Sequence, residues 1–168
     1  LPVQVAFSSG AEDQKIEMLP ITEARNAASG YAMTSAFAVK KMSARCQALP
    51  TPVPEAMASA TSKWNERNID IVESAYFWLL YVKSMLASQN GKDSADAFLA
   101  TTMADFDAQS DGIVKDRFIN DDEKLVCENW IRFISDESLD LNHSTEFGPD
   151  MASISSFYKA TFKSSSER

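Results

Sequence analysis

The sequence is poor in the residues that make turns and break helices. It holds five glycines and six prolines among 168 residues, which argues against the turn-rich architectures of β-sandwiches and β-barrels. It also lacks a run of about eighteen apolar residues, so no segment is expected to span a membrane. The densest apolar stretch, Ala75 to Leu86, is interrupted by Lys83 and is typical of a buried helix. These absences favour a helical domain.

Residues on which enzymes often depend are also scarce. The chain has one histidine, His143, and histidine is the usual general base near neutral pH. No ExxH metal pattern, GxSxG nucleophile elbow or glycine-rich phosphate loop occurs. We interpret His143 as a surface-loop residue, and we expect no cofactor and no enzymatic activity. An enzyme that uses His143 with nearby acids is the alternative.

One acid-rich segment invites comparison with a calcium-binding loop. If Asp107 takes the first position, Asp111 and Gly112 fall at the fifth and sixth positions. The twelfth position, where an EF-hand carries a bidentate glutamate, is Phe118. We therefore interpret the segment as a turn sequence and predict no metal site.

The two cysteines, Cys46 and Cys127, do not form a CxxC pair, so zinc or thioredoxin chemistry is not indicated. Both fall on apolar faces of predicted helices, which is compatible with two buried, reduced thiols. We favour a disulfide formed in an oxidising compartment. In the chain-entropy model, closing a loop of about 80 residues is worth roughly 4 kcal/mol. The chain starts at Leu1 without a methionine, and removal of a signal peptide is the common reason, so we expect an exported protein.

Helical spacing of apolar residues organises the first half of the chain. A helix is expected over residues 22–47, ending before Leu49-Pro50. Pro54, at the end of a proline-rich linker, suits the first turn of a second helix that ends at Asn90-Gly91. The apolar stripe of the first helix is Ala24, Ala28, Tyr31, Ser35, Ala38 and Met42. The stripe of the second is Met57, Ala60, Trp64, Asn68, Ile71, Ala75, Trp78, Val82 and Met85.

The second half of the chain is predicted to form shorter helices joined by loops. Asp93 or Ser94 is the expected N-cap of a third helix, and Asn120 or Asp121 the start of a later one. The dipole of that later helix favours three acids in its first turn. The remaining expectations are a loop over 109–112, a short helix over 113–118, a polar loop over 138–148 and a last helix from 149.

Together these elements predict an all-α fold in a single domain covering residues 1–168. We expect a bundle of five or six helices around one long central helix, with residues 1–14 and 163–168 loosely ordered. A disulfide between Cys46 and Cys127 would join the end of the first helix to the middle of a later one.

Three residues stand out within the long helix. Asn68 falls on the apolar stripe, where a buried amide needs hydrogen-bond partners. Trp64 lies one turn away on the same face, and Arg67 flanks that face, where it can pair with an acid. The favoured interpretation is a core tryptophan with a buried polar lock. The alternative is the floor of a recognition surface.

Charge is distributed unevenly along the chain. The net charge is −8, and an acidic surface repels nucleic acid and anionic lipid, so neither is expected as a partner. Residues 101–150 hold thirteen acids and four bases. This segment is either a solvated face or a surface that docks a basic protein, and a second copy of the chain is a further candidate partner. The candidate partner-binding residues are Asp105, Asp107, Asp111, Asp116, Asp121, Asp122 and Glu123.

A cysteine late in the first helix (Cys46), a linker from Pro50 to Pro54 and the motif Trp64-x-x-Arg67-Asn68 form a recurring pattern. Over roughly residues 22–130 it resembles small exported helical proteins of Gram-negative bacteria. Among these are periplasmic immunity proteins that neutralise type VI secretion effectors. The resemblance implies a periplasmic, disulfide-bearing, non-enzymatic binding protein.

The expected function is therefore that of an immunity protein or inhibitor that binds a cognate, basic effector enzyme. A second hypothesis is an envelope assembly accessory, such as a pilotin-like chaperone, that binds a helix or extended segment. For that role we expect an apolar groove beside Trp64 and Trp78.

Overall fold

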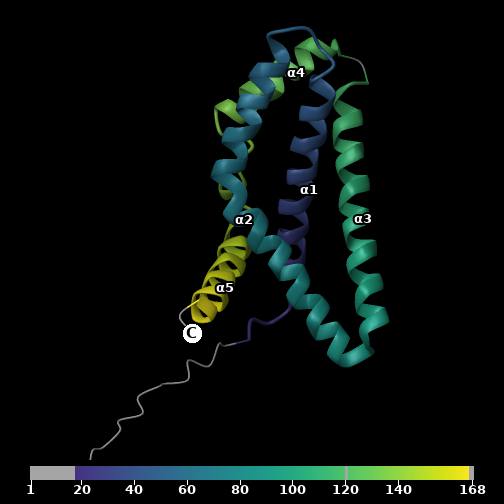
Figure 1. The fold of residues 1–168 in the computed structure, drawn as a ribbon, viewed down its shortest axis with the longest axis vertical. Helices are drawn as coiled ribbons and strands as arrows, with labels where there is room; N and C mark the ends of the chain where they lie inside the picture. The colour runs from purple at the N-terminus through teal and green to yellow at the C-terminus, as the bar shows by residue number, and fades with distance from the viewer. Residues whose placement is uncertain (1–17, 120, 167–168) are drawn as a thin grey trace, which may run out of the picture.

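Three long helices and two shorter ones make up the computed structural model, which describes residues 18–119 and 121–166 (Figure 1). Over that part the all-α prediction is confirmed. Residues 1–14, predicted to be loosely ordered, lie outside the described residues, whereas the backbone of residues 163–166 is helical. The elements are α1 (Glu23–Cys46), α2 (Val53–Asn90), α3 (Lys92–Arg117), α4 (Glu123–Ser135), the short 3-10 turn η1 (Leu141–His143) and α5 (Gly148–Ser166).

The central helix is α2, and α1, α3, α4 and α5 all contact it. Pro54 lies in its first turn, as predicted, and Gly91, with φ of 87°, ends it and lets the chain reverse into α3. Figure 1 shows that α2 bends midway along its length. Near that point the side chains of Asn68 and Ser74 donate hydrogen bonds to carbonyls one turn earlier, at 2.8 and 2.6 Å, and such bonds bend helices.

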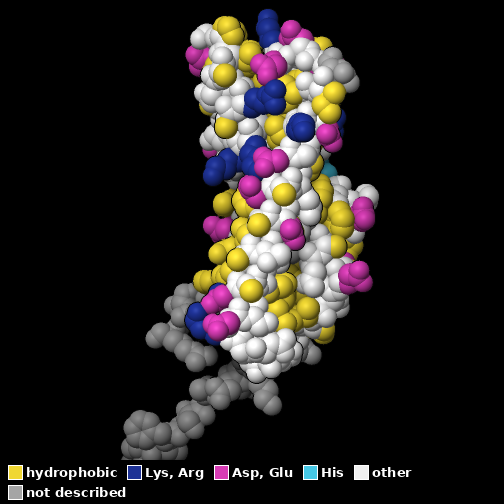
Figure 2. Space-filling view, turned by 90° about the vertical axis from the view of Figure 1, so that its right-hand side faces the viewer, with side chains coloured by type: hydrophobic (Ala, Val, Ile, Leu, Met, Phe, Trp, Pro, Cys, Tyr) yellow, Lys and Arg dark blue, Asp and Glu magenta, His cyan; other side chains and the backbone are white. Residues whose placement is uncertain are grey.

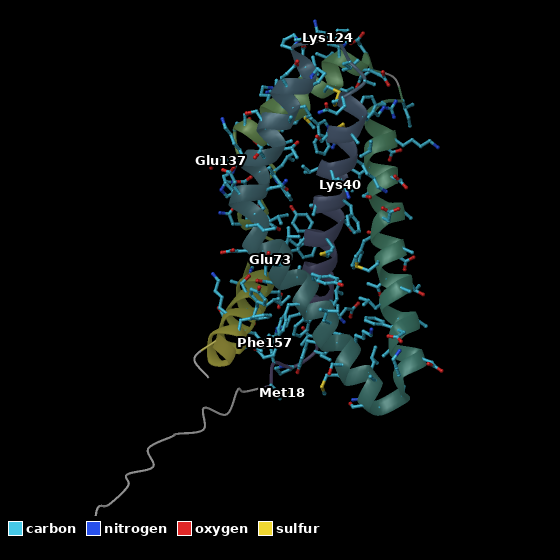
Figure 3. The ribbon with its side chains drawn as sticks, viewed as in Figure 1. Met18, Lys40, Glu73, Lys124, Glu137 and Phe157 are labelled. Atoms are coloured by element: carbon cyan, nitrogen blue, oxygen red, sulfur yellow. A yellow bond between two sulfur atoms is a disulfide. The ribbon has the colours of Figure 1, made fainter. Side chains whose placement is uncertain are left out.

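The apolar stripe predicted for the long helix is the centre of the core. Seven of its nine positions are buried, including Trp64 and Trp78 at 2% and 0% exposed. Aromatic rings attach α5 to the lower half of α2. Phe157 of α5, labelled in Figure 3, lies 5.7 Å from Phe77 and 5.0 Å from Tyr81, measured between ring centroids. None of the helices described here is long and apolar enough to cross a membrane.

The predictions for α3 were partly wrong. The helix is continuous through residues 109–112, where a loop was expected, and it absorbs the short helix expected over 113–118. Phe106, Ser110 and Val114 are buried on one face, and their packing outweighs the cost of about 1 kcal/mol for Gly112 in a helix. Gly91 occupies the N-cap position, and within the described structure neither Asp93 nor Ser94 caps the helix.

The start of α4 also differs from the prediction. Asp122 is the N-cap, and its carboxylate accepts a hydrogen bond from the backbone N–H of Leu125 at 3.1 Å. Of the three acids expected in the first turn, only Glu123 lies in it. The predicted disulfide is present between Cys46, the last residue of α1, and Cys127 in the middle of α4, with Cα atoms 5.9 Å apart.

Candidate functional site

A groove runs along the face of α1 that lies between α3 and the segment joining α4 to α5. It consists of two hollows of about 470 and 340 Å³ that share Tyr31, Ser35 and Ile113 and are therefore continuous. Its lining extends on α1 from Asn26 to Val39, a length of about 20 Å at 1.5 Å per residue. In Figure 2, where α3 faces the viewer, hydrophobic side chains border this helix on both sides.

The floor of the groove is made of small residues on α1. Ala27, Gly30, Thr34, Ser35 and Ala38 recur at helical spacing and line it. Their short side chains keep the backbone of α1 close to the surface. Gly30 also lets the ring of Phe106 approach, because a Cβ added at Gly30 would lie only 3.0 Å from a ring carbon of Phe106.

Aromatic and aliphatic side chains form the walls. Phe106 and Ile113 come from α3, and Trp130 and Leu139 from α4 and the segment after it. The ring of Tyr31 stacks on Phe147 with centroids 4.8 Å apart. This stack lies near the middle of the groove, because Tyr31 lines both hollows.

A buried ion pair holds the wall that follows α4. Arg67 of α2 donates to both carboxylate oxygens of Asp140, at 2.6 and 3.0 Å, and to the carbonyl oxygen of Ile134 at 2.8 Å. The hydrogen bond to Asp140 is the main cause that raises the pKa of Arg67. Asp140 was missed in the sequence, although its position between Leu139 and Leu141 in a polar loop was a signal of burial.

Asn68 and Trp64 complete this network. The amide of Asn68 donates to the carbonyl of Trp64 and to Asp140, and its oxygen accepts from the backbone N–H of Leu141 at 2.8 Å. The indole N–H of Trp64 donates to the carbonyl of Leu139 at 3.0 Å. Of the two interpretations of this motif, the geometry is that of the buried polar lock. The lock fixes Leu139, so the motif supports the groove from behind.

The disulfide supports the same wall from the other end. It ties α4 to the end of α1 through Cys127. Trp130, one turn further along α4, lines the hollow of about 340 Å³. The five residues singled out as structural in the sequence thus lie behind the groove. They position the wall of the groove, and none of the five is among the residues that line it.

The candidate acids divide into two groups. Asp107 and Asp111 pair with Lys41 of α1 at 2.9 and 2.6 Å, and Glu123 pairs with Arg45 at 2.8 Å. Burial lowers the pKa of Lys41, but the hydrogen bonds that its ammonium donates to Asp111 and Asp107 leave the pKa raised overall. With Asp122 used as the N-cap of α4, four of the seven acids have partners inside the protein.

The other acids are exposed. Asp116 borders a small hollow that shares Ile113 and Arg117 with the groove. Asp105 lies eleven residues earlier in α3, close to three helical turns, and therefore on the same flank. Asp121 is exposed before α4, away from the groove lining. Figure 2 shows single acidic side chains on α3 and on the ridge to its right, with hydrophobic atoms between them.

The sequence had also suggested a histidine, a metal loop and a groove in the long helix as candidate sites. His143 is exposed, with Nδ1 3.0 Å from the carbonyl oxygen of Glu137. Within the described residues, no three His, Cys, Asp or Glu side chains are placed to hold a metal ion. The rings of Trp64 and Trp78, beside which a groove was expected, are buried in the core and do not line the groove along α1.

Comparison with known proteins found no matching family model, no matching curated protein and no matching solved structure.

Proposed function

We propose that this chain is a non-enzymatic binding protein that recognises a basic protein partner through the groove along α1. The observation that carries the proposal is the groove itself, a floor of small residues about 20 Å long between mainly apolar walls from α3 and the segment after α4. A continuous concavity lined mainly by apolar side chains suits the anchoring residues of a binding partner.

The exposed acids indicate that the partner is positively charged. Asp105 and Asp116 are exposed on the α3 flank of the groove. Carboxylates at the rim of an interface speed the encounter with a basic partner and disfavour acidic ones. The acids paired with Lys41 and Arg45 contribute less, since their charge is neutralised locally.

The proposed setting is the periplasm of a Gram-negative bacterium, and the proposed role is that of an immunity protein or inhibitor of an effector enzyme. Export is supported by the disulfide between Cys46 and Cys127, because disulfides persist in oxidising compartments. The role is supported by the resemblance to periplasmic immunity proteins in the pattern that ends at Trp64-x-x-Arg67-Asn68.

Site-specific cross-linking tests the proposal. A photoreactive amino acid replaces Ile113 in the groove or, as the matched control, Ile69 on the outer face of α2. The two side chains are 39% and 46% exposed. In the native periplasm we expect Ile113 to cross-link a basic enzyme that Ile69 does not, and co-expression of the chain to suppress that enzyme's toxicity. Identical products from both positions would contradict the proposal.

Charge reversal tests which acids take part. Asp105→Lys with Asp116→Lys should weaken binding of the cross-linked partner. Asp121→Lys should leave it nearly unchanged, because Asp121 is outside the groove lining and, unlike Asp122, does not cap α4. The opposite result would move the docking surface to the start of α4.

An envelope assembly accessory is the second candidate function. It is favoured by one observation, the apolar character of the groove walls, which suits a helix from a machine component as well as one from an enzyme. The cross-linked partner decides between them. An enzyme whose activity is inhibited supports the first candidate, and a structural envelope protein whose assembly fails without this chain supports the second.

A further inference from the structure

We propose that the element bound in the groove is a single amphipathic helix with lysine or arginine along the edge that faces α3. This inference rests on the proposed function and narrows it from a basic protein to one kind of segment. It is carried by the hydrogen-bonding capacity, the shape and the charge of the groove.

Hydrogen bonding favours a helix over an extended segment as the occupant of the groove. The floor is the side of α1, whose backbone groups are already paired within the helix. An extended peptide would bring unpaired N–H and C=O groups against a lining that is mostly apolar, and buried groups without partners are costly. A helix satisfies its own backbone and can present apolar side chains alone.

The shape of the floor fits the same occupant. Small residues at helical spacing, among them Ala27, Gly30 and Ala38, let the backbone of α1 be approached closely, and side-chain ridges of one helix pack into such grooves of another. A floor about 20 Å long accepts three to four turns of a helix.

Charge on the α3 flank determines where the helix carries its basic residues. Asp105 and Asp116 are exposed there, and Asp116 borders a hollow that shares Ile113 and Arg117 with the groove. Arg117 is the basic residue among those that line the groove. An amphipathic helix in the groove would therefore carry basic residues on the edge that faces α3.

A synthetic peptide tests the inference with the full chain in its oxidised form. The probe is a labelled peptide of about 14 residues, with leucines on one face and lysines along one edge of that face. Matched peptides place two prolines in the middle, which breaks the helix, or replace each lysine with glutamate. Binding is read by fluorescence anisotropy against wild type, Ile113→Arg and the control Ile69→Arg, each checked for native helix content.

We expect the lysine peptide to bind wild type and Ile69→Arg alike, and to bind Ile113→Arg about tenfold more weakly. The proline and glutamate peptides should also bind wild type about tenfold more weakly. Equal binding of the proline peptide would overturn the helix in favour of an extended segment. Absence of binding by the lysine peptide, or undiminished binding to Ile113→Arg, would overturn the inference as well.

The proposed function is judged separately by cross-linking from Ile113. If that position captures and neutralises a basic enzyme while the lysine peptide does not bind, the helical occupant is wrong and the proposed function remains. If neither occurs, both are wrong.

Discussion

Arg67 of α2 and Asp140, between α4 and α5, form a two-point ion pair across 73 positions of sequence. The carboxylate is 5% exposed, and the arginine side chain is 27% exposed. Because Asp140 also accepts from Asn68 at 3.1 Å, its charge is paired on the side that faces the core. The pair anchors the segment that carries the wall of the groove.

Removing one partner of this pair should destabilise the protein strongly. Asp140→Asn leaves the guanidinium of Arg67 without its counter-ion, and we expect a loss of about 3 kcal/mol in the free energy of unfolding. Urea denaturation followed by circular dichroism measures it. Glu128→Gln, which removes an exposed ion pair with Lys124 at 3.7 Å, is the control and should change stability by less than about 1 kcal/mol. Equal losses in the two variants would show that the buried pair contributes no more than a surface one.

The disulfide should stabilise the protein by restricting the conformations of the unfolded chain. Replacing Cys46 and Cys127 together with alanine opens a loop of about 80 residues, and we expect a loss of roughly 4 kcal/mol in the chain-entropy model. Wild type unfolded under reducing conditions should match the double variant. Intact mass should fall by two hydrogens when the reduced protein is oxidised. A double variant as stable as oxidised wild type would contradict this prediction.

Two glycines in helices should respond oppositely to alanine. Gly112 has no atom within 4 Å of an added Cβ, so Gly112→Ala should raise the free energy of unfolding by about 1 kcal/mol through helix propensity. At Gly30 the added Cβ would lie 3.0 Å from Phe106, and overpacking should outweigh that gain and leave a net loss of about 1 kcal/mol. Thermal unfolding of the two variants measures the difference. If Gly112→Ala has no stabilising effect, residues 109–112 are not helical in solution.

Asp96 should make the free energy of unfolding depend on pH in the acidic range. Hydrogen bonds first from Lys83 and then from Lys92 lower its pKa from 3.8 to about 2, and the bond from Lys83, 2.6 Å long, joins α2 to α3. A carboxyl whose pKa is lowered by folding stabilises the protein above its unfolded pKa, and that contribution is lost as pH falls toward the folded value. The urea midpoint of Asp96→Asn should therefore lie below that of wild type at pH 6, and the two should converge between about pH 4 and pH 2. A difference that persists to the lower pH would assign the effect to packing.

The pKa of Asp96 can also be followed directly by NMR titration of its carboxyl carbon. Lys83→Gln should raise that pKa more than Lys92→Gln, because the hydrogen bond from Lys83 is the largest cause of the shift. The reverse order would place the stronger partner within α3 and remove the proposed tie between the helices.

Local spacing predicted much of the fold. The stripe through Trp64 and Trp78, the proline at the start of α2 and the glycine at its end are all determined within a few residues of sequence. Helix formation depends on contacts three or four positions apart and on backbone freedom at single residues. For the same reason both cysteines could be placed on apolar helix faces, and a disulfide between them predicted, from the sequence.

The groove and its supports were decided by tertiary structure. Tyr31 and Ser35 share a stripe with core residues such as Met42, and the sequence does not tell a covered helix face from an open one. They remain open because α3 and the segment after α4 are held apart on either side of α1. The partnership of Arg67 with Asp140, and the continuity of α3 past Gly112, likewise depend on residues distant in sequence. The sequence therefore determined which helices form, and packing between them decided which face of α1 remains available for a partner.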